Sequence, residues 1–345
     1  MPGMSSRYSV GFVFGAESVR AMIVNVRDGA VAARTSRASA LVEAHPPDLK
    51  NAATSVCREA IELAQIAPEQ VVGIGVALAQ GSTSAMLVDL YRSDGAAFFG
   101  LRAGLPIYPI VSAAHAIVPG AGVASPSTMV MVIGAGTHLL MNSRIKAAVP
   151  GEITVVEHGI LPGYIGYEAK QASVGEALDR VAAKYGRSHE DLARQAGALA
   201  PGSGGFLGAL TPADAAHAYR ATIEATAFEL RQICDTLRDA GVPVRRFVAA
   251  GALPRKNPLL MQVYADVLDA RIRPAASEEP VALGAAILGA LAAGQEATGH
   301  ASISQTTHAM APRQHELLYR PDLRARKLYD DLYKVYRQRA LSDDA

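Results

Sequence analysis

The clearest pattern of apolar and polar residues in this chain lies between Arg245 and Gly294. A short apolar run, Arg245–Ala249, leads to a glycine at 251, as a buried parallel strand leads into a turn. Apolar residues then recur at helical spacing through Pro258–Ala270, and Ala282–Ala293 consists almost wholly of small and aliphatic residues. We therefore predict a strand, a glycine turn, a helix, a short strand, a loop and a second helix. Open α/β sheets bind ligands at the carboxyl ends of their strands, so Gly251 marks a candidate ligand site.

A similar succession of elements occurs twice along the chain. In the first half the pattern predicts a helix over Pro46–Ile66 and strands at Tyr8–Phe14, Val19–Val26, Ala30–Arg37, Val71–Leu78 and Met86–Leu90. In the second half it predicts strands at Thr128–Ile133 and Thr137–Asn142 around a glycine-rich turn, followed by helices over Tyr167–Tyr185, His189–Ala196 and Pro212–Ala240. A strand, a glycine turn and a second strand open each half. The sequence thus predicts a duplicated α/β unit with a cleft between the two halves.

Composition and charge exclude several classes of protein. Half of the 345 residues are hydrophobic and the net charge is +1, so we expect a large core and no affinity for nucleic acid or for a membrane surface. The longest apolar run, near Met129–Ile133, falls far short of the ~20 residues that a membrane-spanning helix needs. The amino terminus has no apolar core of a signal peptide. Cys57 and Cys234 lie in helical patterns, which predicts buried free thiols and a cytoplasmic location.

Four ordered stretches of sequence carry a resemblance to a known family. They are VGFVFGAESVRAMIVNVRDG at 10–29, MVIGAGTHLLM at 131–141, LPGYIGYEAKQASVGEAL at 161–178, and the set IEATAFELR, AAGALPRKNPLLMQVYADV and VALGAAILGALAAG within 223–294. They resemble the two phosphate loops, a ribulokinase signature and the adenosine half-site of the FGGY carbohydrate kinases, most of all bacterial L-ribulokinase. The resemblance implies duplicated actin-like ATPase (ribonuclease-H-like) domains with an interdomain cleft. We accordingly expect domains at 1–122 and 123–310 and a helical tail at 311–345.

The same resemblance implies ATP as the candidate cofactor. The positions that match the family's nucleotide site are Gly11, Gly15, Gly134, Gly136, Thr137, Gly251, Ala252 and Asn257, with Ala252 standing where the family has a second glycine. Glycine turns of this kind can present backbone amides to a phosphate. The alternative for Gly134–Thr137 is a plain hairpin turn, and the alternative for Asn257 is helix capping.

Three departures from the family pattern bear directly on catalysis. The Asp of the first loop, which the resemblance implies as a partner of magnesium, is Val13, and the Asp that ends a following strand is Ala77. The Asp that would act as general base is Ala113. Magnesium requires oxygen ligands, so we expect no metal site from these residues. A general base is typically worth about 10²–10⁴ in rate, and alanine cannot accept a proton. The family's long sugar-binding insertion before Ala113 is also shortened.

Three functions remain open from the sequence. The first is a degenerate pseudokinase that still binds nucleotide and acts through a protein partner or its own oligomer. The second is an active kinase or ATP hydrolase for an altered small substrate, which would recruit Glu17 for metal or His115 as base. The third is a scaffold or small-ligand binding protein that uses no nucleotide. The basic segment Arg320–Arg339 has interspersed acids and predicts a solvated amphipathic helix rather than a binding surface.

Overall fold

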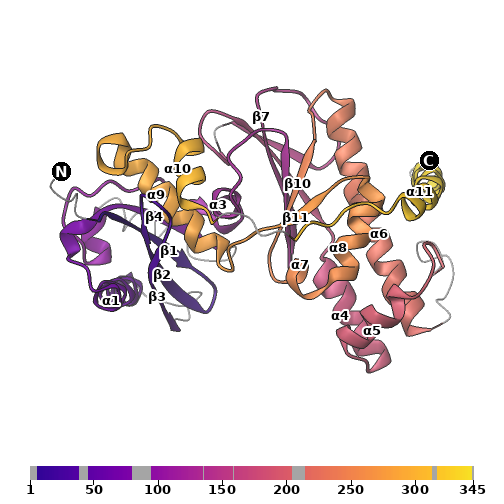
Figure 1. Ribbon diagram of the computed structural model, residues 1–345, viewed down its shortest axis with the longest axis horizontal. Coiled ribbons are helices and arrows are strands. Elements are labelled where there is room, and N and C mark those ends of the chain that lie inside the picture. Colours follow the sequence, from indigo (N-terminus) through magenta and orange to yellow (C-terminus); the bar gives the residue numbers. More distant parts are fainter. Residues whose placement is uncertain are drawn as a thin grey trace. The chain divides into compact units, whose positions relative to one another are not determined.

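The computed structural model describes residues 6–38, 46–79, 95–134, 136–157, 159–203, 214–312 and 317–343. The chain forms two compact units, each around one mixed sheet, as a duplicated α/β fold predicts (Figure 1). The first unit consists of Met1–Ser125, Gly159–Gly163 and Ala275–Gln314, and the second of Pro126–His158, Tyr164–Pro274 and His315–Ala345. This division differs from the expected continuous ranges 1–122, 123–310 and 311–345. The difference arises because Ala275–Gln314 packs in the first unit and the C-terminal helix packs in the second.

The sheet of the first unit has its strands in the order β3-β2-β1-β4-β5. Their bounds are Val31–Ala38, Ser18–Asn25, Tyr8–Phe14, Val71–Leu78 and Val111–Ser112. Strand β1 pairs antiparallel with β2 and parallel with β4. The sequence predicted the first four strands to within one or two residues but missed β5, while the strand predicted at Met86–Leu90 lies outside the described residues.

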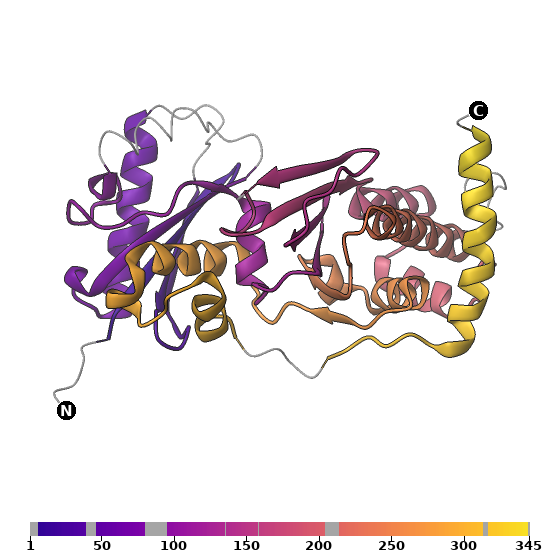
Figure 2. The same cartoon turned by 90° about the horizontal axis from the view of Figure 1, so that it is seen from above.

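Helices cover both faces of this sheet (Figures 1 and 2). Helix α1 (Pro46–Ala64) packs on one face, where Phe12 and Val56 share a buried core. The other face is covered by α3 (Ala113–Gly120) and α9 (Pro280–Thr298). The remaining elements of this unit are α10 (Ile303–Met310) and the short 3₁₀ helices η1 (Pro68–Gln70) and η2 (Gly95–Phe99).

Helix α9 approaches the sheet at backbone distance, which only glycine permits at the contact points. A Cβ atom added to Gly75 of β4 would lie 1.9 Å from the carbonyl oxygen of Ala285, and one added to Gly11 of β1 would lie 2.1 Å from that of Ala282. Gly11, expected at a phosphate loop, therefore has a packing role in the structure. The helix extends beyond the predicted Ala282–Ala293 at both ends.

Helix α9 also corrects the expectation that the longest apolar run lies near Met129–Ile133. Among the described helices, it alone is long and apolar enough, by length and composition, to cross a membrane. Its small apolar residues from Ala282 to Ala290 are buried against β1, β4 and α3. This packing accounts for the apolar composition of the helix as that of a core element.

The sheet of the second unit has its strands in the order β11-β10-β6-β7-β9-β8. Their bounds are Ile272–Pro274, Arg246–Ala250, Thr128–Ile133, Thr137–Ser143, Ile165–Gln171 and Ile153–Glu157. The helices of this unit are α4 (Val174–Tyr185), α5 (His189–Gly197), α6 (Ala215–Asp239), α7 (Leu253–Lys256), α8 (Pro258–Leu268) and α11 (Leu323–Asp343). Both cysteines are buried free thiols, as predicted, and burial raises the pKa of Cys57 and of Cys234 to about 12.

The predicted helix over Tyr167–Tyr185 was wrong in its first part. Residues Ile165–Gln171 form β9, which lies between β7 and β8. Tyr167, Ala169 and Gln171 alternate inward, a period of two that the sequence pattern already contained. The helix begins only at Val174, where the Ser173 hydroxyl accepts the backbone N–H of Glu176.

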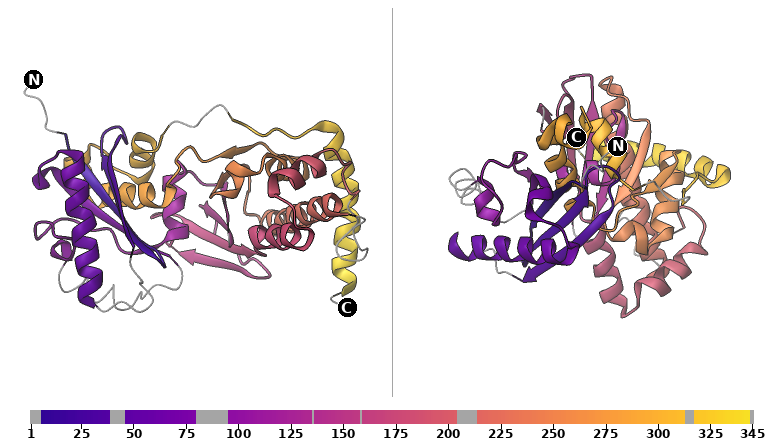
Figure 3. Two further views of the ribbon diagram at one scale, coloured as in Figure 1. Left: turned by 90° about the horizontal axis from the view of Figure 1, so that it is seen from below. Right: turned by 60° about the vertical axis from the view of Figure 1, so that its left-hand side comes forward.

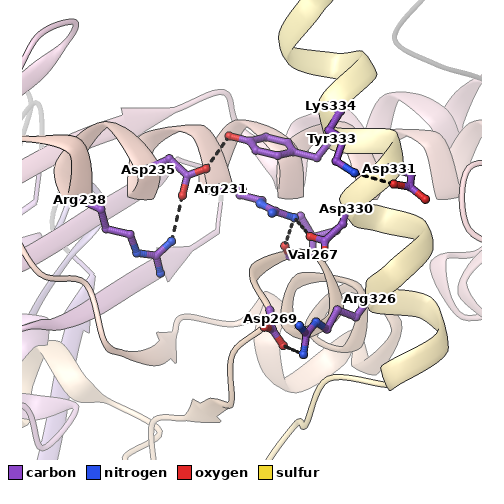
Figure 4. Close-up of polar contacts among 10 residues, drawn as sticks. All are labelled: Arg231, Asp235, Arg238, Val267, Asp269, Arg326, Asp330, Asp331, Tyr333 and Lys334. Atoms are coloured by element: carbon purple, nitrogen blue, oxygen red, sulfur yellow. Dashed lines mark hydrogen bonds and ion pairs between the residues drawn. The ribbon is translucent and has the colours of Figure 1, made fainter.

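The C-terminal helix α11 is the amphipathic helix that its charges predicted, with most of its charged side chains exposed, but its aromatic face is buried. It runs crosswise to α6 and α8 (Figures 2 and 3) and buries Tyr329 and Tyr333 in the core of the second unit. Arg231 of α6 donates to Asp330 at 2.7 Å, and the hydroxyl of Tyr333 donates to Asp235 at 3.0 Å; both contacts are drawn in Figure 4. The charged residues of α11 thus form ion pairs around a buried aromatic face.

A buried ion pair within α6 holds α11 in place through hydrogen bonds to Tyr329. The Nε atom of Arg220 donates to Glu224 at 2.8 Å, and the hydroxyl of Tyr329 donates to the same carboxylate at 2.8 Å. The guanidinium also donates to the carbonyl of Ala196 and to the Tyr329 hydroxyl. Burial raises the pKa of Tyr329, and the neighbouring Glu224 raises it further, so the phenol stays protonated. Each partner in this network depends on the others for its charge or hydrogen bonds.

Substitution of Gly75 by Ala tests the close packing of α9. We expect a loss of about 1–3 kcal/mol in stability, because the added methyl group must displace backbone atoms. Thermal unfolding monitored by circular dichroism would measure the loss. Gly197→Ala is the control, since its Cβ would meet only Leu259 at 3.9 Å. Equal melting temperatures for Gly75→Ala and the unsubstituted protein would contradict this account.

Glu224→Gln tests the attachment of α11. It would leave the Arg220 guanidinium buried without a carboxylate, and breaking such a pair costs about 3–5 kcal/mol. Urea unfolding followed by tyrosine fluorescence measures the cost. Asp191→Asn, which removes the exposed ion pair with Arg194, serves as control and should change the stability little, because solvent screens this pair. Similar small losses for the two variants would argue against a fastening role.

Candidate functional site

The first unit brings the three positions that lack an acid to one edge of its sheet. Val13 and Ala77 are direct partners in the parallel pairing of β1 with β4, so their side chains lie next to each other on one face. Both are buried, at 1% and 0% exposure. Ala77 pairs in turn with Val111 of β5, and Ala113 begins α3 two residues later. Three neighbouring strand ends thus meet without a carboxylate at any of the three positions.

An arginine lies beside Val13 on the neighbouring strand of the sheet. Arg20 of β2 is the antiparallel partner of Val13, and its Nε atom is buried without a hydrogen-bond partner. The Arg20 guanidinium comes within 3.9 Å of Glu279, and Arg34 of β3 comes within 3.0 Å of the same carboxylate. This edge of the first unit therefore has two arginines paired with one glutamate, next to the position where the resemblance implies a metal-binding acid.

Glu279 is the acid in this region that the sequence analysis missed. It precedes α9 directly, at the N-cap position. The Glu-Glu-Pro sequence before an apolar helix was the available signal, since acids and proline favour a helix start. Its ion pairs with two arginines on other strands form only in the folded structure, so the residues next to Glu279 in the sequence cannot predict them.

The two replacement candidates lie in different surroundings. Glu17 is exposed in the turn between β1 and β2, where the Gly15 N–H donates to the Ser18 carbonyl at 2.9 Å. His115 is half-buried in the first turn of α3, and its backbone N–H donates to the Ser112 hydroxyl at 3.1 Å. Within the part of the chain that the structure describes, no three His, Cys, Asp or Glu side chains come together as a metal site. The residues at this edge do not fit magnesium.

In the second unit, the β6–β7 turn contains Gly134, Gly136 and Thr137. The Gly134 N–H donates to the Gly136 carbonyl at 3.2 Å, so this amide closes the turn and is not presented outward. Thr137 is 2% exposed, and its hydroxyl has no partner. Its cross-strand neighbour Gln171 likewise has an unpartnered buried oxygen, although its amide donates to the Thr226 carbonyl. Two neighbouring buried polar atoms without hydrogen-bond partners are unusual in the core of a folded protein.

Gly251 follows β10 at the carboxyl edge of the same sheet. Its φ of +105° is one that residues with a side chain rarely adopt, and an added Cβ would lie 2.3 Å from the Ile133 carbonyl oxygen. The glycine is therefore required by the chain itself. Ala252 has a right-handed conformation with φ −76°, so the lost second glycine caused no strain.

Asn257 has the structural role that was the alternative to nucleotide binding. Its side-chain oxygen accepts the Leu260 N–H at 3.1 Å and caps α8, and its amide donates to the Tyr219 hydroxyl at 3.0 Å. That hydroxyl also lies 3.2 Å from Nδ1 of His189, whose Nε2 is 2.9 Å from Asp179. Burial raises the pKa of Tyr219 to about 12. The chain of four polar residues connects α4, α5, α6 and α8.

Sequence comparison supports a kinase relationship. The C-terminal domain of the FGGY family of carbohydrate kinases matches residues 193–293. The ribulokinase of Bacillus licheniformis is 37% identical over 275 residues, which is 69% of this chain and 50% of that protein. The ribulokinase of Shouchella clausii is 36% identical over 272 residues, covering 69% of this chain and 48% of that protein. The chain spans about half the length of the curated relatives it matches.

Solved structures show the fold. A xylulose kinase from Rhodospirillum rubrum superposes with a TM-score of 0.80 at 17% identity, covering 97% of this chain and 99% of that chain. A glycerol kinase from Plasmodium falciparum, solved with ADP, gives 0.74 at 11% identity, covering 97% and 98%. At such identities the likeness concerns architecture alone, and the architecture is the actin-like ATPase fold. The chain is therefore a ribulokinase-like homologue of the FGGY carbohydrate kinases.

Proposed function

We propose that this chain is a degenerate kinase that binds a nucleotide without transferring phosphate to a sugar. The proposal rests mainly on the pairing of Val13 with Ala77, two buried apolar side chains at adjacent strand ends of the first unit. Phosphoryl transfer relies on positioned metal ions and on a residue that orients or deprotonates the nucleophile. These two positions and Ala113 supply neither oxygen ligands nor a base.

Nucleotide binding is supported by what the two sheets retain. The left-handed Gly251 keeps a close, side-chain-free turn at the carboxyl end of β10, and the buried Thr137 hydroxyl at the β6–β7 turn lacks a partner. In the first unit Arg20 is a cation with an unpartnered Nε. Arginine can meet phosphate oxygens directly, so we propose that binding needs no magnesium.

The proposal includes how such a protein would act and where. A kinase homologue without its acids has no turnover to contribute, so we propose that it works through a protein partner or through a second copy of itself. Two buried free thiols suit a reducing compartment, which favours the cytoplasm.

The direct test is calorimetric titration with ATP, once with magnesium and once with EDTA. We expect binding with dissociation constants that agree within about threefold in the two conditions, because no acid here recruits the metal. Phosphate release in a coupled assay should equal the no-enzyme control, with and without L-ribulose. Turnover above that control would favour the active kinase or ATP hydrolase, and Glu17→Gln and His115→Gln would then identify its residues. If ATP does not bind even at millimolar concentration, the remaining hypothesis is a scaffold or small-ligand binding protein that uses no nucleotide.

Val13→Asp tests whether the first unit still has a metal-binding environment. We expect a loss of about 2–4 kcal/mol in stability, since a carboxylate replaces a buried apolar side chain. Thermal unfolding is measured with and without 10 mM magnesium for Val13→Asp and for the apolar control Val13→Ile. The comparison separates the cost of burying a carboxylate from any stabilisation by bound magnesium. A magnesium-dependent rise in melting temperature for the Asp variant alone would show that the surrounding metal site has survived, contrary to our account.

A further inference from the structure

We propose that Arg246, Arg271 and Arg320 in the second unit form a docking row for an acidic helix of a partner protein. The inference rests on the proposed function, in which a homologue without turnover acts through a partner, and it names the surface and the chemistry of that partner. The row crosses the start of β10, the residue before β11 and the segment that pairs with β11. Strands β10 and β11 lie side by side in the second unit (Figure 1).

Strand pairing places the three arginines next to one another. Phe247 of β10 is the parallel partner of Ile272 in β11, and Tyr319 forms an isolated antiparallel bridge with Ile272. The backbones of Ile272 and Tyr319 exchange two hydrogen bonds of 3.0 Å. Each of these three residues has an arginine beside it, before it in the two strands and after it in the antiparallel segment. Neighbouring strands are about 4.8 Å apart, so the docking row spans about 10 Å.

The three arginines stand on the face of the sheet opposite the core. Phe247 and Ile272 are buried in the core of the second unit, and Tyr319 packs against that core. Successive side chains along a strand point to opposite faces, so the arginines one position away point away from the core. All three arginines are exposed. The docking row is therefore a surface feature that the packing of this unit does not require.

The docking row brings like charges together. Like charges at directly opposed positions of a sheet are destabilising. The acids two positions from Arg271 and Arg320 are engaged elsewhere. Asp269 pairs with Arg326 at 3.2 Å. Asp322 accepts two backbone N–H groups at the start of α11. Carboxylates supplied by another molecule would relieve the repulsion within the row.

The spacing and chemistry of the docking row favour carboxylates carried on a helix. The planar guanidinium of arginine matches a carboxylate with two parallel hydrogen bonds. Acidic side chains at positions i, i+4 and i+7 of a helix have Cβ atoms about 5–6 Å apart, which is close to the spacing of strands. A helix laid across the strands can thus set one carboxylate against each arginine.

Other occupants suit the docking row less well. The net charge of the chain is +1, so the protein has no overall field that would attract nucleic acid. A second copy docked about a two-fold axis presents the same surface to its partner, which would set arginines against arginines. An acidic segment of a different protein has the complementary charge.

Fluorescence anisotropy with a labelled alanine-based helical peptide tests the docking row. The peptide carries glutamate at i, i+4 and i+7, and a matched peptide carries glutamine there. We expect the acidic peptide alone to bind, with an affinity that falls as salt is added. Arg271→Gln and Arg320→Gln should each weaken binding about threefold, and together about tenfold, the scale of exposed ion pairs. Arg180→Gln, which removes an exposed cation on α4, should leave binding unchanged.

Thermal unfolding at low salt provides a second measurement, which also shows that the variants fold. Arg271→Gln should raise the melting temperature, because it removes the central charge between Arg246 and Arg320. A lower melting temperature would show that Arg271 stabilises the fold, and would contradict the repulsion on which the docking row is argued.

The outcomes separate the docking row from nucleotide binding. Acidic-peptide binding that the double variant retains in full, or that the unsubstituted protein lacks, would overturn the docking row while ATP binding is measured independently. Duplex DNA that binds more tightly than the acidic peptide, and is lost in the double variant, would assign the row to nucleic acid and overturn it too. If the unsubstituted protein binds no ATP but loses the acidic peptide on substitution, the nucleotide function fails and the docking row stands.

Discussion

The backbone approach of α9 to β1 and β4 is the constraint on which the first unit depends. A helix with a side chain at Gly11 or Gly75 beneath it could not lie so close, and the resulting contact buries the central strands β1 and β4 on that face of the sheet. The same approach places Glu279, at the start of α9, within reach of Arg20 and Arg34 on neighbouring strands. Packing and electrostatics at this edge therefore have one cause. A helix further from the sheet would release both the core contact and the ion pairs.

The absence of acids changes the electrostatic character of this edge. Among the residues that the structure describes, the charged groups near Val13 and Ala77 include Arg20 and Arg34, which pair with Glu279, and Glu17 in the turn after β1. Under the proposed function, an anion at this edge would be neutralised by these side chains and not by a metal ion.

Periodicity predicted the elements whose burial follows a simple rule. Strands β4 and β6 were predicted to the residue because their apolar runs are bounded by polar or turn residues. Strand β9 was missed because its residues were read together with the helical pattern that follows Val174, and the alternation of Tyr167, Ala169 and Gln171 was overridden. The aromatic residues of α11 recur at 329, 333 and 336, a helical face that the surrounding charges concealed.

Site prediction depended on a different kind of information. The resemblance located Val13, Ala77 and Ala113, and strand pairing explains why residues 64 positions apart can share one location, since Val13 pairs with Ala77. The roles of Gly11 and Asn257 as packing and capping residues required their tertiary partners, Ala282 and Tyr219. Glu279 was missed for the same reason. The role of each of these residues depends on a neighbour on another strand or helix, which no local pattern encodes.

The discontinuous make-up of the first unit has a consequence for biosynthesis. A ribosome releases β1 to β5 early, yet the helix that covers their second face emerges only after most of the second unit has been translated. Most of one apolar face of the nascent first sheet therefore stays uncovered while the 149 residues from Pro126 to Pro274 are translated, of which only the five at Gly159–Gly163 belong to the first unit. Chaperone occupancy of that face during synthesis, and sensitivity of yield to translation rate, follow from the order in which the chain supplies its own core.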